Sequence, residues 1–312
     1  MPEPAALTIP ARCYSDRQWV FTENEKLWRK AWLLAGTVEQ VAEPGDFVET
    51  RFGLAPMMLV RGQDGRLRGF ENVCQHQGAP LCLGSGQGLT EIECKNHRWC
   101  WDLGGHLTAV DFGQPVGDGN DIPLRPLVVE AWGPFVFATF DPGAPPLADA
   151  IATLVATLDT AGIDPATLRC RSIVSTLVGG NWKSLLDEAT AVGAVPDLGV
   201  RQYPDLAVRV DGDTVTIVRA RPYVSIDRAQ FDVLVFEPRP AGSADTGHRP
   251  LEVTLKGDAE LPPETGVDPS LIDFARRQIG AVPPTDDLTA DAGTPEMLAL
   301  HTWLDAFGVT AG

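Results

Sequence analysis

The sequence predicts an α+β protein of two domains, in which a small antiparallel β domain precedes a domain of helices and antiparallel sheet. Its 312 residues are enough for about two domains. Between residues 45 and 140, short alternating or apolar runs are separated by Gly-rich turns, a pattern typical of strands. The Pro- and Gly-rich segment 141–146 follows and leads into longer helical patterns, so it is the expected linker.

The first domain is expected to begin with a helix and to continue as short strands. Residues 15–35 carry apolar side chains at helical spacing, and we expect this helix to pack on the second domain. The runs 47–50 and 57–60 have the composition of strands, and a Gly-containing turn at 61–65 follows them.

The second domain is expected to mix helices with strands. A helix is expected over 147–161, and another is expected to follow the segment 179–183 and to continue to about Ala194. The other expected elements are a strand around 171–176, a hairpin over 207–218 that turns at Asp211-Gly212, strands at 231–236 and 251–255, and amphipathic helical segments at 271–279 and 295–307.

The composition excludes two classes of partner. The chain has 42 acidic and 25 basic residues, so its formal net charge is -17, which repels phosphate backbones and anionic lipid surfaces. We therefore expect no nucleic-acid partner and no membrane association. No stretch approaches the roughly 18 apolar residues of a membrane span. The first residues lack the basic and apolar regions of a secretory signal, so we expect a cytoplasmic protein.

Two short clusters of cysteine and histidine are the strongest chemical signal. Cys74 and His76 are followed, after seventeen intervening residues, by Cys94 and His97. Two such loops facing each other supply two sulfurs and two nitrogens, which suit a zinc ion or a [2Fe-2S] cluster. Each of the two loops contributes one cysteine and one histidine. This division is the one needed when two cysteines hold one iron and two histidines hold the other. This division favours the cluster.

The residues around these clusters resemble a known family. The segments 72–81, 94–99 and 102–105, together with Pro44-Gly45-Asp46, are similar to the cluster-binding region of Rieske non-haem iron oxygenases of the ring-hydroxylating type, in their larger, catalytic-type subunit. The resemblance covers about the first 200 residues. Departures from the common pattern are Gln77 and Lys95-Asn96, none of which removes a ligand.

The resemblance implies the domain organisation and the ligands. Residues 1–40 would form an N-terminal helical segment packed on the second domain, 41–142 an all-β Rieske [2Fe-2S] domain, and 143–312 an α+β domain of the ring-hydroxylating oxygenase type. The four implied iron ligands of the cluster are Cys74, His76, Cys94 and His97. The other cysteines, interpreted as small buried side chains outside the site, are Cys13, Cys82, Cys100 and Cys170.

The oxygen-activating part of the family pattern is not recognisable in the second domain. In relatives, a helix that opens like Asn181-Trp182-Lys183 carries a carboxylate and then two histidines. A gap-free alignment places Ala191, Ala194 and Gly199 at those positions, and none of these residues can bind a metal. The sequence therefore predicts a vestigial site that binds no mononuclear Fe(II) and contains no catalytic residue.

Other residues do not restore that site at the level of sequence. No histidine occurs between His106 and His248, and His301 lies near the last residues. Asp286 or Asp287 lies where the family's late aspartate would be expected, but an acidic loop needs no metal. Asp187, Glu188 and Asp197 are interpreted as carboxylates that face water.

Three functions remain open from the sequence. The first is a non-catalytic electron-transfer subunit in a trimer-based hetero-oligomer, with a homologous catalytic Rieske oxygenase subunit as partner and a reductase or ferredoxin as electron donor. The alternative is a Rieske oxygenase that hydroxylates or demethylates an aromatic or other small organic substrate at an unusual iron site. In a third, non-redox interpretation, the cluster or a zinc ion only stabilises the fold of the β domain.

Overall fold

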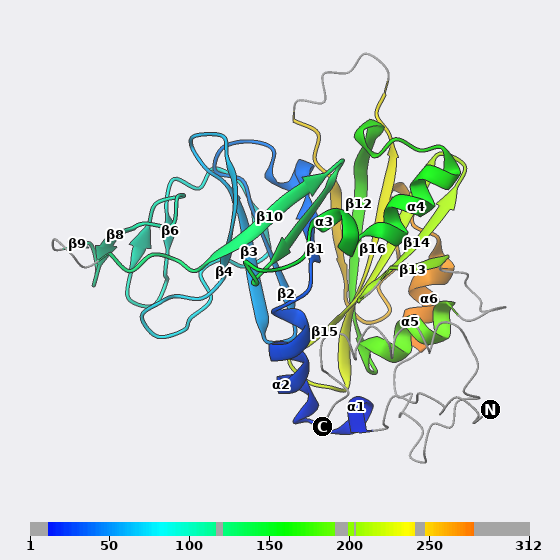
Figure 1. The fold of residues 1–312 in the computed structure, drawn as a ribbon, viewed down its shortest axis with the longest axis horizontal. Helices are drawn as coiled ribbons and strands as arrows, with labels where there is room; N and C mark the ends of the chain where they lie inside the picture. The colour runs from blue at the N-terminus through cyan, green and yellow to red at the C-terminus, as the bar shows by residue number, and fades with distance from the viewer. Residues whose placement is uncertain (1–11, 117–120, 191–198, 203, 241–246, 278–312) are drawn as a thin grey trace.

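The computed structural model describes residues 12–116, 121–190, 199–202, 204–240 and 247–277. Two large sheets form its two halves, and the elements between β4 and β10 extend from the first sheet, away from the second (Figure 1). The predicted fold class is confirmed: a β-rich half with the cysteine and histidine loops precedes a half that combines one sheet with helices.

The first sheet has seven strands in the order β1-β11-β10-β4-β3-β2-β5, and all its pairs are antiparallel. Its strands are β1 (Leu33–Thr37), β2 (Phe47–Phe52), β3 (Ala55–Arg61), β4 (Leu67–Glu71), β5 (Ser85–Gly86), β10 (Pro126–Trp132) and β11 (Phe135–Thr139). β2 alternates between buried and half-buried positions, whereas six of the seven residues of β3 are buried. β3 therefore lies in the core of this sheet, as its apolar run predicts.

A smaller antiparallel sheet, in the order β6-β7-β8-β9, carries the second cysteine and histidine loop. Its strands are β6 (Ile92–Glu93), β7 (Cys100–Trp101), β8 (Leu107–Val110) and β9 (Gln114–Pro115). A separate apolar core joins it to the first sheet, because Trp101 and Leu107 cluster with Met58 and Phe70.

The predicted helix over 15–35 is wrong in its second half. The chain forms α1 (Arg12–Ser15), α2 (Trp19–Glu23) and the π-helical turn η1 (Asn24–Trp28), and then extends into β1. All five residues of β1 are buried, and the strand pairs with β11. Pairing inside the sheet therefore outweighs the local helical spacing.

The second sheet has the order β13-β14-β15-β16-β12-β17. Its strands are β12 (Leu168–Gly179), β13 (Val200–Gln202), β14 (Leu206–Asp211), β15 (Thr214–Pro222), β16 (Arg228–Pro238) and β17 (Leu251–Leu255). The predicted hairpin is formed by β14 and β15, with Gly212 at a φ of 58° in its turn. The sheet is not wholly antiparallel, because β17 pairs with β12 in parallel.

Helices cover the two faces of this sheet. Leu154 and Leu158 pack on one face with Ile217 and Leu234, and Trp182 and Leu185 pack on the other. The helices are α3 (Leu147–Ala150), α4 (Ala152–Ala161), α5 (Trp182–Thr190) and α6 (Pro269–Arg277), and the 3-10 turns are η2 (Val38–Val41), η3 (Pro165–Thr167) and η4 (Pro263–Thr265). None of the described helices is long and apolar enough to cross a membrane.

The helix predicted over 147–161 is present as α3 and α4, interrupted at Ile151. α5 begins at Trp182, inside the segment 179–183 after which the helix is expected, and its predicted end near Ala194 lies outside the described residues. The predicted segment 295–307 also lies outside them.

A buried ion pair fastens α2 to the start of α5. The ammonium of Lys183 is fully buried, and its Nζ lies 2.5 Å from Oε1 of Glu23. The indole N–H of Trp182 donates to the other oxygen of Glu23 at 3.0 Å. One carboxylate of the N-terminal segment thus accepts two hydrogen bonds from the first turn of α5.

Candidate metal centre

The structure brings the four predicted ligands together on two facing loops. The first loop follows β4 and carries Cys74 and His76, and the second connects β6 to β7 and carries Cys94 and His97. The side chains of Cys74 and Cys94 are 3% and 1% exposed. The rings of His76 and His97 lie with their centroids 4.7 Å apart at an angle of 73°. The sulfurs therefore lie inside, and the imidazoles lie toward the surface.

The two loops use the same backbone turn. The carbonyl of Cys74 accepts a hydrogen bond from the N–H of Gly78 at 2.9 Å, and the carbonyl of Cys94 accepts one from Arg98 at 2.9 Å. Each cysteine N–H donates in turn to the residue five positions later, which is Ala79 or Trp99. Gly78 has a φ of 75° and Arg98 a φ of 55°, so both loops turn through a left-handed residue.

A buried asparagine braces the first loop. The side-chain oxygen of Asn72 accepts hydrogen bonds from the N–H groups of Leu81 at 3.1 Å and Cys82 at 2.9 Å. Its amide nitrogen donates to the carbonyl of Cys82 at 2.8 Å. One fully buried side chain thus ties the beginning of the loop to its end and fixes the loop that carries Cys74 and His76.

This donor set fits a [2Fe-2S] cluster. Two buried sulfurs and two outward imidazoles match the ligation in which cysteines hold one iron and histidines the other. Burial, and then the neighbouring Cys94 thiol, raise the pKa of the Cys74 thiol. Because iron binds the thiolate form of cysteine, binding of the cluster must release the proton of the buried Cys74 thiol.

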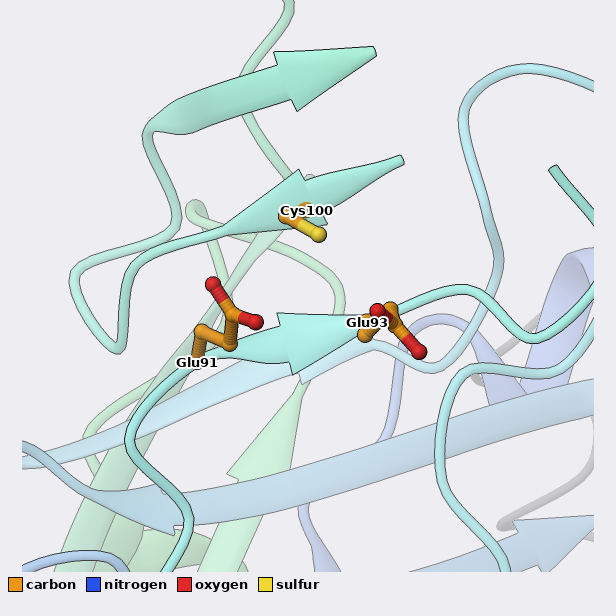
Figure 2. Close-up of side chains that lie close together, drawn as sticks. All are labelled: Glu91, Glu93 and Cys100. Atoms are coloured by element: carbon orange, nitrogen blue, oxygen red, sulfur yellow. The ribbon is translucent and has the colours of Figure 1, made fainter. Parts of the chain in front are cut away.

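A second group of metal-ligating side chains lies beside the second loop. Atoms of Glu91, Glu93 and Cys100 lie within 4.8 Å of one another, with both carboxylates on or beside β6 and the thiol on β7 (Figure 2). The two oxygens of Glu93 already accept from Lys95 at 3.1 Å and Arg98 at 3.0 Å. Burial and the two nearby carboxylates raise the pKa of Cys100, so its thiol stays protonated. The contacts of Glu93 with Lys95 and Arg98 hold the second loop in place.

The remaining cysteines lie in the interior. Burial raises the pKa of the Cys82 thiol to about 11, and Cys170 is fully buried. Cys13 lies in the core that contains Trp28 and Trp182.

That Ala191, Ala194 and Gly199 mark a vestigial iron site stays a prediction. Ala191 and Ala194 have no ligating atom in their side chains, and they lie outside the described residues. Gly199 is described, and a Cβ built on it would lie 2.2 Å from the carbonyl oxygen of Val208. No side chain of any kind has room at position 199.

The other histidines are apart from one another where the structure describes them. Nε2 of His248 lies 2.8 Å from the carbonyl oxygen of Cys170, and Nδ1 of His106 lies 3.5 Å from Asp121. His301, Asp286 and Asp287 lie outside the described residues.

One buried carboxyl group was missed by the sequence analysis. Asp205 is 1% exposed, and neither of its carboxyl oxygens has a hydrogen-bond partner among the described residues. Burial raises its pKa to about 7, although Arg219 and Arg221 partly oppose the shift. Its backbone carbonyl accepts a hydrogen bond from the N–H of Ala220 on β15 at 2.9 Å, and Ala220 packs in the same core as Trp182 of α5. An aspartate before a strand usually faces water, so no signal in the sequence marked it.

Comparison with known proteins supports the cluster. Residues 31–118 match the model of the Rieske [2Fe-2S] domain. The carnitine monooxygenase oxygenase subunit of Escherichia coli K12 is 32% identical over 184 residues, which cover 58% of this chain and 49% of that protein. The glycine betaine monooxygenase oxygenase subunit of Pseudomonas aeruginosa is 25% identical over 184 residues, 58% of this chain and 42% of that protein. The match thus spans about half the length of these relatives, or less.

Solved structures extend the likeness to the second domain at the level of fold. The apo form of the quaternary ammonium Rieske monooxygenase CntA has a TM-score of 0.63 and 22% identity, over 76% of this chain and 77% of that chain. Naphthalene 1,2-dioxygenase from Rhodococcus bound to indole has a TM-score of 0.58 and 15% identity, over 99% of this chain and 83% of that chain.

These matches overturn the expectation of a catalytically inactive electron-transfer subunit. The relatives that share the Rieske half are oxygenase subunits, and solved CntA structures contain the substrates L-carnitine and gamma-butyrobetaine. The expectation extended an observation on Ala191, Ala194 and Gly199 to the whole chain, and assumed that iron can be held only there. The chain is thereby identified as a relative of the alpha-type oxygenase subunits of Rieske non-haem iron oxygenases.

Proposed function

We propose that the chain is an oxygenase component that hydroxylates or demethylates a small organic substrate. In this proposal residues 41–142 form the cluster domain and 143–312 the substrate domain. Electrons enter through a [2Fe-2S] cluster held by Cys74, His76, Cys94 and His97. The observation that carries the proposal is the pair of matched loops, which present two buried sulfurs and two outward imidazoles.

The names of the relatives suggest which substrates to test first. The carnitine and glycine betaine monooxygenase subunits each match 184 residues of this chain in sequence. Quaternary ammonium compounds of that kind are therefore the first candidates. Aromatic hydrocarbons are the second, because a biphenyl 2,3-dioxygenase alpha subunit is 33% identical over 149 residues.

The oxygenase reaction calls for an unusual iron site in this chain. A mononuclear iron, where bound, supplies the activation of dioxygen. Position 199 cannot contribute a ligand, so such an iron requires a different ligand set. Asp205 is a buried carboxyl group without a hydrogen-bond partner among the described residues, whereas the buried Glu23 is already bonded to Trp182 and Lys183 of α5.

The position of the cluster loops favours a multimer. β6 and β8 lie at the end of the first half that points away from α5 (Figure 1). A trimer-based assembly would bring the cluster of one chain to the second half of a neighbour, either another copy or a homologous subunit. A solved quaternary ammonium Rieske monooxygenase of 19% identity is described in terms of inter-subunit electron transfer. The electron donor would be a reductase or a ferredoxin.

The test combines metal analysis with turnover. The chain is purified without oxygen, and iron, acid-labile sulfide and EPR spectra are measured. The expected result is about two irons and two sulfides in a Rieske-type cluster, plus additional iron. Oxygen uptake and product are then followed with a reductase and carnitine, glycine betaine or naphthalene. Turnover should disappear in Cys94→Ser. A full, reducible cluster in a chain that consumes no oxygen with any of these substrates would contradict the proposal.

A further inference from the structure

A strained turn contacts the second ligand loop and is not used by the proposed function. Asp111, Phe112 and Gly113 have φ values of 38°, 64° and 95°. Two consecutive non-glycine residues in the left-handed region are strained, so their surroundings must hold them there. Such strain is commonly found where a backbone positions functional groups.

Two hydrogen bonds join the turn to the second ligand loop. The backbone N–H of Phe112 donates to the carbonyl oxygen of His97 at 3.1 Å. The indole N–H of Trp99 donates to the carboxylate of Asp111 at 3.1 Å. Asp111 therefore fixes the orientation of the Trp99 ring, and Phe112 fixes the backbone of one histidine ligand.

Trp99 in turn contacts His76, the histidine ligand of the first loop. The rings of Trp99 and His76 are stacked, with centroids 4.8 Å apart and planes only 4° from parallel. His76 is exposed, whereas Trp99 is half-buried. The indole thus covers one face of an imidazole that would otherwise meet water on that face.

We propose that Trp99, held by Asp111, is a positioning residue that fixes the ring of His76 and lowers the reduction potential of the cluster. Two ferric irons, two sulfides and two thiolates sum to zero charge, and one added electron makes the cluster anionic. Water stabilises that added charge, and the indole keeps water from one face of the His76 ring. The negative face of an aromatic ring also disfavours nearby negative charge. Both effects predict a higher potential when Trp99 is replaced.

The proposal requires the cluster but not oxygenase activity. Potentials measured on a chain that shows no turnover still test it, so its failure and the failure of the proposed function are distinguishable.

The experiment is an EPR-monitored redox titration of the anaerobically purified chain and its variants. Trp99→Leu and Asp111→Ala are expected to raise the potential while iron and sulfide per chain stay at the wild-type value. Trp99→Phe keeps a ring that can stack, and Asp111→Asn keeps an oxygen acceptor, so both should lie closer to wild type than Trp99→Leu and Asp111→Ala do. Trp132→Leu is the matched control, because Trp132 stacks on Phe135, outside the core that contains Cys74 and Cys94.

Several outcomes would overturn the proposal. One is an unchanged potential in Trp99→Leu with a full cluster, and another is an equal rise in Trp132→Leu. If Trp99→Leu loses its cluster, the reduction potentials of Asp111→Ala and Asp111→Asn test the proposal instead. A raised potential in the alanine variant that the asparagine variant restores supports the positioning role, and equal potentials in the two overturn it.

Discussion

At the scale of single residues, Asp205 makes stability depend on pH. Its pKa of about 7 in the folded chain lies above the ordinary 3.8. The folded chain therefore binds a proton that the unfolded chain has lost, and stability falls as pH rises from about 4 to about 7. Asp205→Asn should raise the free energy of unfolding by a few kcal/mol at pH 8 and by much less at pH 4.

Urea unfolding at the two pH values measures this effect. Asp213→Asn is the control, because Asp213 is exposed in the turn between β14 and β15. An Asp205→Asn gain of equal size at both pH values would show that the carboxyl group is not protonated in the fold.

Lys183 and Glu23 give a second prediction at this scale. Lys183→Met leaves the carboxylate of Glu23 buried with only the indole of Trp182 as donor, so it should cost about 3–5 kcal/mol. Adding Glu23→Gln removes the isolated charge and should recover part of that loss. Urea unfolding of both variants provides the comparison, and a double variant no more stable than Lys183→Met would contradict this account.

At the scale of elements, the two ligand loops allow a matched comparison. Gly78 and Arg98 occupy the same position of the same turn, and both have positive φ. A Cβ at position 78 would meet no atom within 4 Å, so Gly78→Ala should cost about 1–2 kcal/mol through backbone strain alone. Arg98→Gly relieves that strain and loses an exposed ion pair to Glu93, which is worth about 0–1 kcal/mol.

Iron release to a chelator measures the integrity of the loops. We expect Gly78→Ala to release iron faster than wild type, and Arg98→Gly to release it at nearly the wild-type rate. Faster release from Arg98→Gly than from Gly78→Ala would mean that the Glu93 ion pair, not the turn, holds the loop.

At the scale of the whole molecule, one buried network joins the two sheets. Asp232 on β16 accepts from Arg219 at 2.9 Å and from Arg221 at 2.6 Å. Burial alone would raise the pKa of Asp232, but the two guanidinium groups hold it well below its ordinary value. Arg219 also donates to the carbonyl of Leu34, and Arg221 to the hydroxyl of Thr50 at 3.1 Å, and both of these acceptors are on the first sheet.

This network predicts that the two halves unfold together. Scanning calorimetry of the wild-type chain should show one cooperative transition. Arg221→Met removes the bonds to β2, so the midpoint should fall and the transition should broaden or split. An unchanged, single transition in Arg221→Met would mean that contacts other than those of Arg221 couple the unfolding of the two halves.

The sequence predicted the parts that depend on local chemistry. The four cluster ligands could be named because thiols and imidazoles at short spacing are rare and their partners lie within 24 residues. The hairpin at Gly212 could be located because only a few residue types suit its turn. β1 was taken for helix because its partner, β11, lies about 100 residues later in the chain.

The second half was harder to predict because its features depend on distant contacts. Asp205 is buried through its neighbours on β15, and nothing around it in the sequence indicates this. In the first half, the Asp111–Trp99 contact was also missed, because it joins residues twelve positions apart through a turn that glycine-based rules would not expect at Phe112. The inference of an inactive subunit was wrong because it treated one segment as representative of the whole domain.

The parallel pairing of β12 with β17 also bears on how the chain is synthesised. β12 pairs with β16 by a register from Leu168 to Gly179, and within the described part of the chain its other edge, from Ser172 to Thr176, pairs with residues 251–255. On the ribosome this edge therefore stays open until β17 emerges, and an open edge is a template for association with other nascent chains. The arrival of β17 ends that exposure and also ties the two halves, because Glu252 accepts hydrogen bonds from Gln40 and Ser85.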